Sequence, residues 1–218
     1  MVKDATRHDV VRAAQSAPLT FGWLLILFVT TRIQRSAGRR GSRRIQRKHS
    51  TNLRRLSSEP SRVLAASLFW LDGRMWWPYV PMFVGIVAPA ERRLRWWRWL
   101  LVGLTAHVIG TVAGQGFLRW SLKRGEAPRR LVDARDVGVS YFVLGLAGAL
   151  SGYVRPHWRA RGQAAAVVAL AGNAALRPTF TEVGHLTAFC VGLAAIPLAP
   201  GRDAMPYPAE AAGSKIAP

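Results

Sequence analysis

The sequence predicts an all-α membrane protein folded as a polytopic bundle of six transmembrane helices, and three observations lead to this prediction. Half of the 218 residues are hydrophobic. Lys and Arg outnumber Asp and Glu by 31 to 11, which gives a formal net charge of +20. The basic residues lie almost entirely between uncharged apolar runs, because an ionised side chain is unfavourable in hydrocarbon and favourable at the headgroups.

Six uncharged or nearly uncharged runs are long enough, with their polar flanks, to cross a bilayer core, which takes about 20 residues. In chain order they are Ala13–Thr31, Met75–Ala90, Trp99–Leu118, Val137–Val154, Gly162–Leu176 and Val183–Ala199. The second run is short and broken by Pro78 and Pro81, and the fifth is also short, so five spans are the main alternative. No clear small-residue cleavage site follows the first run, which favours an uncleaved anchor over a signal peptide.

A long connection, 32–74, separates the first two runs and carries 12 of the 31 basic residues. Its second half, Leu64–Leu71, is apolar but too short to cross the membrane. We therefore expect this segment to lie at the membrane interface, with Phe69 and Trp70 at the level of the headgroups.

This organisation gives one membrane domain, 13–199, between a short N-terminal tail, 1–12, and a Pro/Ala-rich C-terminal tail, 200–218, that we expect to be disordered. The lipid bilayer, including its anionic lipids, is the first predicted partner, because arginine clusters attract acidic headgroups. Nucleic acid is not an expected partner, since no nucleic-acid-binding motif accompanies the charge. The single cysteine, Cys190, excludes an intrachain disulfide and a thiolate metal site, and no metal or cofactor is predicted.

Polar residues inside the spans are the candidate functional residues, and two of them fall at matched depths. The fourth and sixth runs have one helix between them, so they cross the membrane in the same direction. Ser140 lies four residues beyond Asp136, and His185 lies three beyond Glu182. A rise of about 1.5 Å per residue places both side chains roughly 5–6 Å inside the same membrane face.

Small residues follow Ser140 and His185 at helical spacing, and they allow the two helices to pack closely in lipid. The small residues are Gly148 and Gly152 on the fourth run, and Ala188 and Gly192 on the sixth. If these faces meet, a serine lies beside a histidine base, which is the minimal activated nucleophile for acyl transfer. The structural alternative is that each side chain only satisfies a buried or local backbone partner, and the residues alone support both interpretations equally.

Three short motifs occur in order along the chain, each at a defined place in one of the predicted runs. Glu91-Arg92-Arg93-Leu94 follows the second run, Gly138-x-Ser140 opens the fourth, and Gly184-His185-x-x-Ala188-x-x-x-Gly192 lies in the sixth. Together, along residues 53–199, they resemble the rhomboid family of intramembrane serine proteases. The resemblance implies a six-helix fold and a Ser–His dyad without an aspartate, with Ser140 as nucleophile and His185 as general base. It also implies that the substrates or clients are transmembrane proteins, cut in or beside their spanning segments.

The sequence departs from the rhomboid pattern at three places. Rhomboid proteases carry a His and an Asn four apart in the second helix as oxyanion donors, and these positions fall here near Met75 and Tyr79. Arg95 stands where a Gly usually follows the leucine of the helix-closing motif, and Tyr141 follows the nucleophile where the family prefers Gly. Two functions are therefore predicted: an intramembrane serine protease, or, as the alternative, a catalytically inactive rhomboid-like pseudoenzyme that binds transmembrane clients.

The resemblance and the helix geometry predict how the site is built. Ser140 Oγ should lie within about 4 Å of a ring nitrogen of His185. An oxyanion would be held at the start of the fourth helix, by the backbone around Gly138 and Ser140, and by the hydroxyl of Tyr79.

No third carboxylate is expected to orient His185, because Asp136 and Glu182 are predicted to lie at the membrane surface. Packing against Tyr141 or the region of Gly184 would then hold the imidazole ring.

His107, near the middle of the third run, is expected to be a structural residue bonded to a neighbouring helix, with Thr111 or Asn173 as its partner. The six runs predict a multi-pass protein of the cell membrane. The rhomboid topology would place the basic connection 32–74 outside the cell, against the positive-inside rule, so the membrane orientation and the oligomeric state are left open.

Overall fold

The computed structural model describes residues 15–72, 75–134, 136 and 138–201. The described part of the chain is helical and contains no strand, and its one isolated β-bridge joins Thr51 and Asp136. The all-α prediction is therefore confirmed. The predicted tail 1–12 and most of the predicted tail 200–218 lie outside the described residues.

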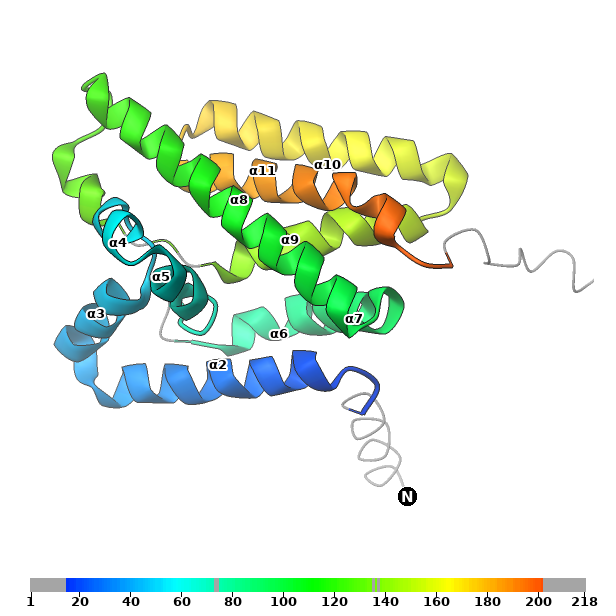
Figure 1. The fold of residues 1–218 in the computed structure, drawn as a ribbon, viewed down its shortest axis with the longest axis horizontal. Helices are drawn as coiled ribbons and strands as arrows, with labels where there is room; N and C mark the ends of the chain where they lie inside the picture. Colours follow the sequence, from blue (N-terminus) through cyan, green and yellow to red (C-terminus); the bar gives the residue numbers. More distant parts are fainter. Residues whose placement is uncertain (1–14, 73–74, 135, 137, 202–218) are drawn as a thin grey trace, which may run out of the picture.

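Long helices form the body of the bundle, and shorter helical segments connect them (Figure 1). The long helices are α2 (Pro18–Ser36), α8 (Trp96–Lys123), α9 (Val139–Leu150), α10 (Pro156–Leu176) and α11 (Phe180–Ala194). The shorter segments are α3 (Gly38–His49), α4 (Leu53–Ser58), α5 (Pro60–Ser67), η1 (Trp77–Tyr79), α6 (Val80–Met82), η2 (Phe83–Val87), α7 (Ala88–Leu94), η3 (Arg129–Asp133), η4 (Ser151–Tyr153) and η5 (Ile196–Leu198). In Figure 1, α3, α4 and α5 gather at the end of the bundle from which α9 and α11 begin.

Each predicted run is helical, but only α8 is long and apolar enough by itself to cross a bilayer among the described residues. The second run is divided into a 3-10 turn, a short α-helical turn, a π-helix and α7, because Pro78 and Pro81 interrupt the normal hydrogen-bond ladder. The apolar helices Val139–Tyr153 and Phe180–Ala194 are shorter than a full span. The count of six crossings therefore stays a prediction.

An aromatic cluster joins α2, η2, α8 and α9 in the core of the bundle. Trp23, Phe83, Trp99 and Phe142 meet edge to face, with ring centroids 4.8 to 6.1 Å apart. The indole N–H groups of Trp23 and Trp99 donate to backbone carbonyls, so neither is left unsatisfied in the core. This packing fixes α9, and hence the start of α9 at the candidate site, relative to α2 and α8.

The Glu91-Arg92-Arg93-Leu94 motif closes the second helical run by binding the start of α2. The buried Glu91 carboxylate accepts from the backbone N–H groups of Leu19 and Thr20, at 2.9 and 2.7 Å, and from the Thr20 hydroxyl at 2.6 Å. A carboxylate is favourable there because the first N–H groups of a helix lack intrahelical acceptors. Leu94 is fully buried in the core, so the motif also anchors α7 in the bundle.

Part of Leu64–Leu71, the segment predicted to lie at the membrane interface, is buried within the bundle. Leu68 and Leu71 are buried in the core of the bundle, because the connection 32–74 folds back onto the end of the bundle. Trp70 stacks on His49 of α3 with ring centroids 4.7 Å apart, while Phe69 stays exposed.

Arg95 joins α7 to α8 with φ 66° and ψ 152°, and it is the one non-glycine residue with positive φ in the described ranges. Only glycine adopts this region without strain, and such strain is on the order of 1–3 kcal/mol. We therefore expect Arg95→Gly to raise the free energy of unfolding by roughly 1 kcal/mol, seen as a melting temperature about 2–4 °C higher in detergent. Arg95→Ala, which removes the same side chain but keeps Cβ, should melt like the wild type. Equal melting of the two variants would show that the backbone here is unstrained.

Candidate active site

Glycines bring α8, α9 and α11 into backbone contact behind the site. A Cβ atom on Gly145 of α9 would overlap the side chain of Ala106 on α8, and one on Gly192 of α11 would overlap the Gly145 carbonyl. A Cβ on Gly148 would overlap the Phe189 carbonyl of α11. The small-residue faces predicted on the fourth and sixth runs therefore do meet, which is the packing that small residues allow between membrane helices.

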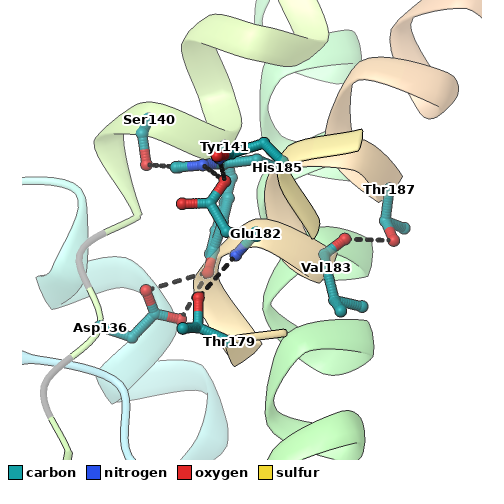
Figure 2. Close-up of polar contacts among 9 residues, drawn as sticks. Asp136, Ser140, Tyr141, Thr179, Glu182, Val183, His185 and Thr187 are labelled. Atoms are coloured by element: carbon teal, nitrogen blue, oxygen red, sulfur yellow. Dashed lines mark hydrogen bonds and ion pairs between the residues drawn. The ribbon is translucent and has the colours of Figure 1, made fainter. Parts of the chain in front are cut away.

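Ser140 and His185 face each other across this contact. Ser140 is the second residue of α9, and His185 lies in the second turn of α11. His185 Nε2 lies 3.0 Å from Ser140 Oγ. Figure 2 shows the two side chains pointing toward each other. The predicted separation of less than about 4 Å is confirmed.

Glu182 also belongs to this site, and the prediction that no carboxylate orients His185 is wrong. Its Oε2 lies 3.5 Å from His185 Nδ1, and both side chains are about four-fifths buried, with exposed fractions of 20% and 21%. The same oxygen accepts from Asn173 Nδ2 of α10 at 2.5 Å. The i, i+3 spacing of Glu182 and His185 was the signal in the sequence, because it places both side chains on one helix face.

Asp136, predicted to lie at the membrane surface, is 3% exposed and lies buried within the protein. Its side chain accepts from the Tyr141 hydroxyl at 2.9 and 3.0 Å and from Gln115 Nε2 at 3.5 Å. The physical reason is tertiary: the backbone of Asp136 pairs with Thr51, which draws this segment under the connection 32–74. The sequence carried no signal for the Asp136–Tyr141–Gln115 network. The place of Asp136 depends on its pairing with Thr51, which lies far away in the chain.

Tyr141 packs against the imidazole ring of His185, as predicted, and Gly184 leaves room for this tyrosine. The Tyr141 and His185 rings meet edge to face with centroids 5.4 Å apart. A Cβ on Gly184 would come within 2.6 to 2.7 Å of atoms of the Tyr141 side chain, so only glycine leaves room for this tyrosine. The His185 ring is thus bounded by the serine, the glutamate and the tyrosine that Figure 2 labels.

The two residues predicted to serve an oxyanion have different surroundings. The Gly138 N–H donates to the Ser67 carbonyl at 3.2 Å, and a Cβ on Gly138 would overlap the His107 ring. Tyr79 packs against the hydrophobic core, and no hydrogen bond joins it to Ser140 within the described ranges. The first N–H groups of α9, which include that of Ser140, lack acceptors within the helix.

His107 is a structural residue, as expected, although its partners differ from those predicted. It is 1% exposed, and its Nε2 lies 3.0 Å from the Leu64 carbonyl and 3.3 Å from Ser67 Oγ, both on α5. Asn173 donates to α11 instead, and the buried Thr111 hydroxyl has no hydrogen-bond partner among the described residues. His107 therefore ties α8 to α5, the helix that comes just before the core leucines of the connection.

A helical bundle with many exposed apolar side chains, one helix long and apolar enough to cross a bilayer, and a Ser–His pair at the start of two packed helices are the features expected of a rhomboid-type membrane protein. The chain matches the family of rhomboid-like proteins over residues 11–205, which is most of its length. It belongs to this family. No curated protein and no solved structure is similar enough to the chain to match it.

Proposed function

We propose that this rhomboid-like protein is an intramembrane serine protease that cleaves peptide bonds in or near the transmembrane segments of other proteins. Ser140 is the nucleophile and His185 is the general base. The observation that carries the proposal is the 3.0 Å contact between Ser140 Oγ and His185 Nε2. A hydroxyl held on an imidazole nitrogen is the arrangement that activates serine for attack on a carbonyl.

In the reaction, Ser140 Oγ attacks the peptide carbonyl carbon while its proton passes to His185 Nε2. The C–N bond of the tetrahedral intermediate then breaks, and the imidazolium returns the proton to the leaving amine. Water, deprotonated by the same nitrogen, then attacks the acyl-serine ester, and the imidazolium returns this proton to Ser140 Oγ as the C–O bond breaks and the new carboxylic acid leaves. Glu182, 3.5 Å from Nδ1, stabilises the imidazolium in both steps.

The start of α9 supplies the electrostatic stabilisation that the intermediate needs. Its N–H groups and the positive end of its dipole lie beside Ser140 Oγ, where the negative charge of an oxyanion would form. The backbone at Gly138 fixes this helix start, and Tyr79 stays the proposed second donor.

The chain crosses the cell membrane six times in this proposal, through α2, the helical run 77–94, α8, α9 with η4, α10, and α11 with η5. Large apolar side chains point outward from these elements: Leu25, Val112 and Val168 are 61%, 55% and 70% exposed. Such a surface suits lipid and is unfavourable in water. The partners are therefore the bilayer and transmembrane protein substrates.

The second candidate is a pseudoenzyme that binds transmembrane clients without cutting them. Met75 and Tyr79 stand near the positions where rhomboid proteases carry their oxyanion donors, and methionine donates no hydrogen bond. Losing one oxyanion donor typically lowers the rate by on the order of 10²–10³.

Fluorophosphonate labelling of the purified, detergent-solubilised full chain separates the two candidates. A protease should be labelled covalently at Ser140, and Ser140→Ala and His185→Ala should both abolish the label. Ser151→Ala is the matched control, because the Ser151 hydroxyl at the other end of the same span donates to the Gly148 carbonyl at 2.6 Å and should not react. A folded wild type that stays unlabelled at high probe concentration would favour the pseudoenzyme.

A further inference from the structure

A hollow of about 650 Å³ lies at the end of the bundle where α9 begins. Its walls come from α3 and α4, which are neighbours in the chain, and from η3, which lies far from both in the sequence (Figure 1). We call it the basic hollow, because six cationic side chains line it: Arg44, Arg47, Lys48, Arg54, Arg55 and Arg130. Asp133 is the one carboxylate among the described residues that line it.

Hydrogen bonds hold the backbone around the basic hollow in place. The Asn52 side chain accepts from the Arg55 N–H at 3.0 Å and so caps α4. The Arg55 guanidinium donates to the Lys48 carbonyl at 2.7 Å and joins α4 to the end of α3. On the other wall, Arg54 lies 3.6 Å from Asp133 of η3. The walls are therefore an ordered part of the fold.

The positive charge in the basic hollow exceeds what its acidic partner can neutralise. Burial, followed by the charges of Lys48, Arg55 and Arg62, lowers the pKa of His49 at the end of α3. Like charges held this close raise the energy of the folded chain, so a bound anion would relieve their repulsion.

Tryptophans near the basic hollow indicate that it lies at headgroup depth. Trp70 stacks on His49, which follows the lining residue Lys48. Trp120 is 45% exposed near the end of α8, with the Arg124 guanidinium 4.3 Å from its ring centroid, and α8 leads directly to η3. Tryptophan gathers at the membrane–water interface, so an acidic lipid headgroup is the anion within reach.

We propose that the basic hollow binds the phosphate of an anionic phospholipid headgroup. Guanidinium groups match phosphate oxygens with paired, charge-assisted hydrogen bonds, and several of them converge here. The proposal also gives a reason for the 12 of 31 basic residues in the connection 32–74, which the positive-inside rule would not favour in the rhomboid topology. It does not depend on whether Ser140 is catalytic.

Native mass spectrometry of the full chain in neutral detergent tests this, with phosphatidylglycerol, phosphatidylcholine and soluble glycerol 3-phosphate as probes. The wild type should bind phosphatidylglycerol more tightly than either other probe. The double variant Arg44→Gln/Arg47→Gln should bind it about ten-fold more weakly, since hydrogen bonds to charged groups contribute about 1.5–3 kcal/mol before solvent screening. Arg130→Gln, on the opposite wall, should weaken binding in the same direction.

The matched control is Arg39→Gln/Arg40→Gln, which removes the same charge from the same helix at exposed positions outside the basic hollow. It should bind phosphatidylglycerol like the wild type. Equal weakening in both double variants would mean diffuse attraction and would overturn the proposal. If glycerol 3-phosphate bound as tightly as phosphatidylglycerol or more tightly, the ligand would be a soluble phosphate and the lipid assignment would be overturned. Circular dichroism confirms that each variant remains folded.

Discussion

Gly192→Ala should lower the free energy of unfolding by roughly 3 kcal/mol or more and abolish probe labelling of Ser140. The added Cβ would overlap the Gly145 carbonyl, so backbone meets backbone and no side chain can rotate away. Overpacking a core usually lowers stability by about 1–3 kcal/mol, and a rigid neighbour gives the upper end of that range or more. Because His185 lies on the same helix, moving α11 away from α9 also separates the Ser–His pair. Thermal melting and labelling of the purified chain measure the two effects.

Gly116→Ala is the matched control for this prediction. Gly116 lies within α8 and has nothing within 4 Å of where a Cβ would stand. Alanine should therefore stabilise the helix there by about 0.5–1 kcal/mol, because it restricts the unfolded chain. If both variants melted like the wild type, the close approach of α9 and α11 would not exist as described.

The sequence predicts the helical class and the approximate positions of the helices because both follow from local properties. Long uncharged runs must satisfy their backbone hydrogen bonds internally in lipid, so α8 appears within a few residues of its predicted bounds. The connection 32–74 could not be predicted in the same way. The apolar segment that contains Leu68 and Leu71 is too short to cross the membrane, and its sequence does not indicate that tertiary folding buries both leucines in the core.

The same difference between local sequence and tertiary contacts decides which residues of the candidate site could be predicted. Ser140 and His185 could be paired from the sequence because helical rise and small-residue spacing fix their depth and facing. Asp136 could not be placed, since its burial depends on a bridge to Thr51 from another part of the chain. Glu182 was within reach of the same local argument, but its predicted place at the membrane surface hid its contact with the histidine.

That contact makes Glu182 a positioning residue for His185. Nδ1 can donate to the carboxylate only in the tautomer that leaves Nε2 free to accept the proton of Ser140, so the contact selects the working form of the ring. The negative charge also stabilises the imidazolium that forms during attack. A buried aspartate in this role can contribute on the order of 10⁴ to the rate, but Glu182 is partly exposed and 3.5 Å away, so its effect should be smaller.

Glu182→Gln should therefore slow fluorophosphonate labelling of Ser140 by about ten- to a hundred-fold, equivalent to about 1.4–2.7 kcal/mol of activation free energy. The loss should fall on the first-order labelling constant, with the half-saturating probe concentration unchanged, because Glu182 acts on the proton acceptor and not on probe binding. Asn173→Ala is the control: it removes the other partner of the carboxylate, at 2.5 Å, without changing the charge. It should label less than about three-fold more slowly than the wild type, since the contact with His185 survives. If Asn173→Ala and Glu182→Gln slowed labelling equally, Glu182 would only join α10 to α11, and the Ser140–His185 pair would act without a carboxylate.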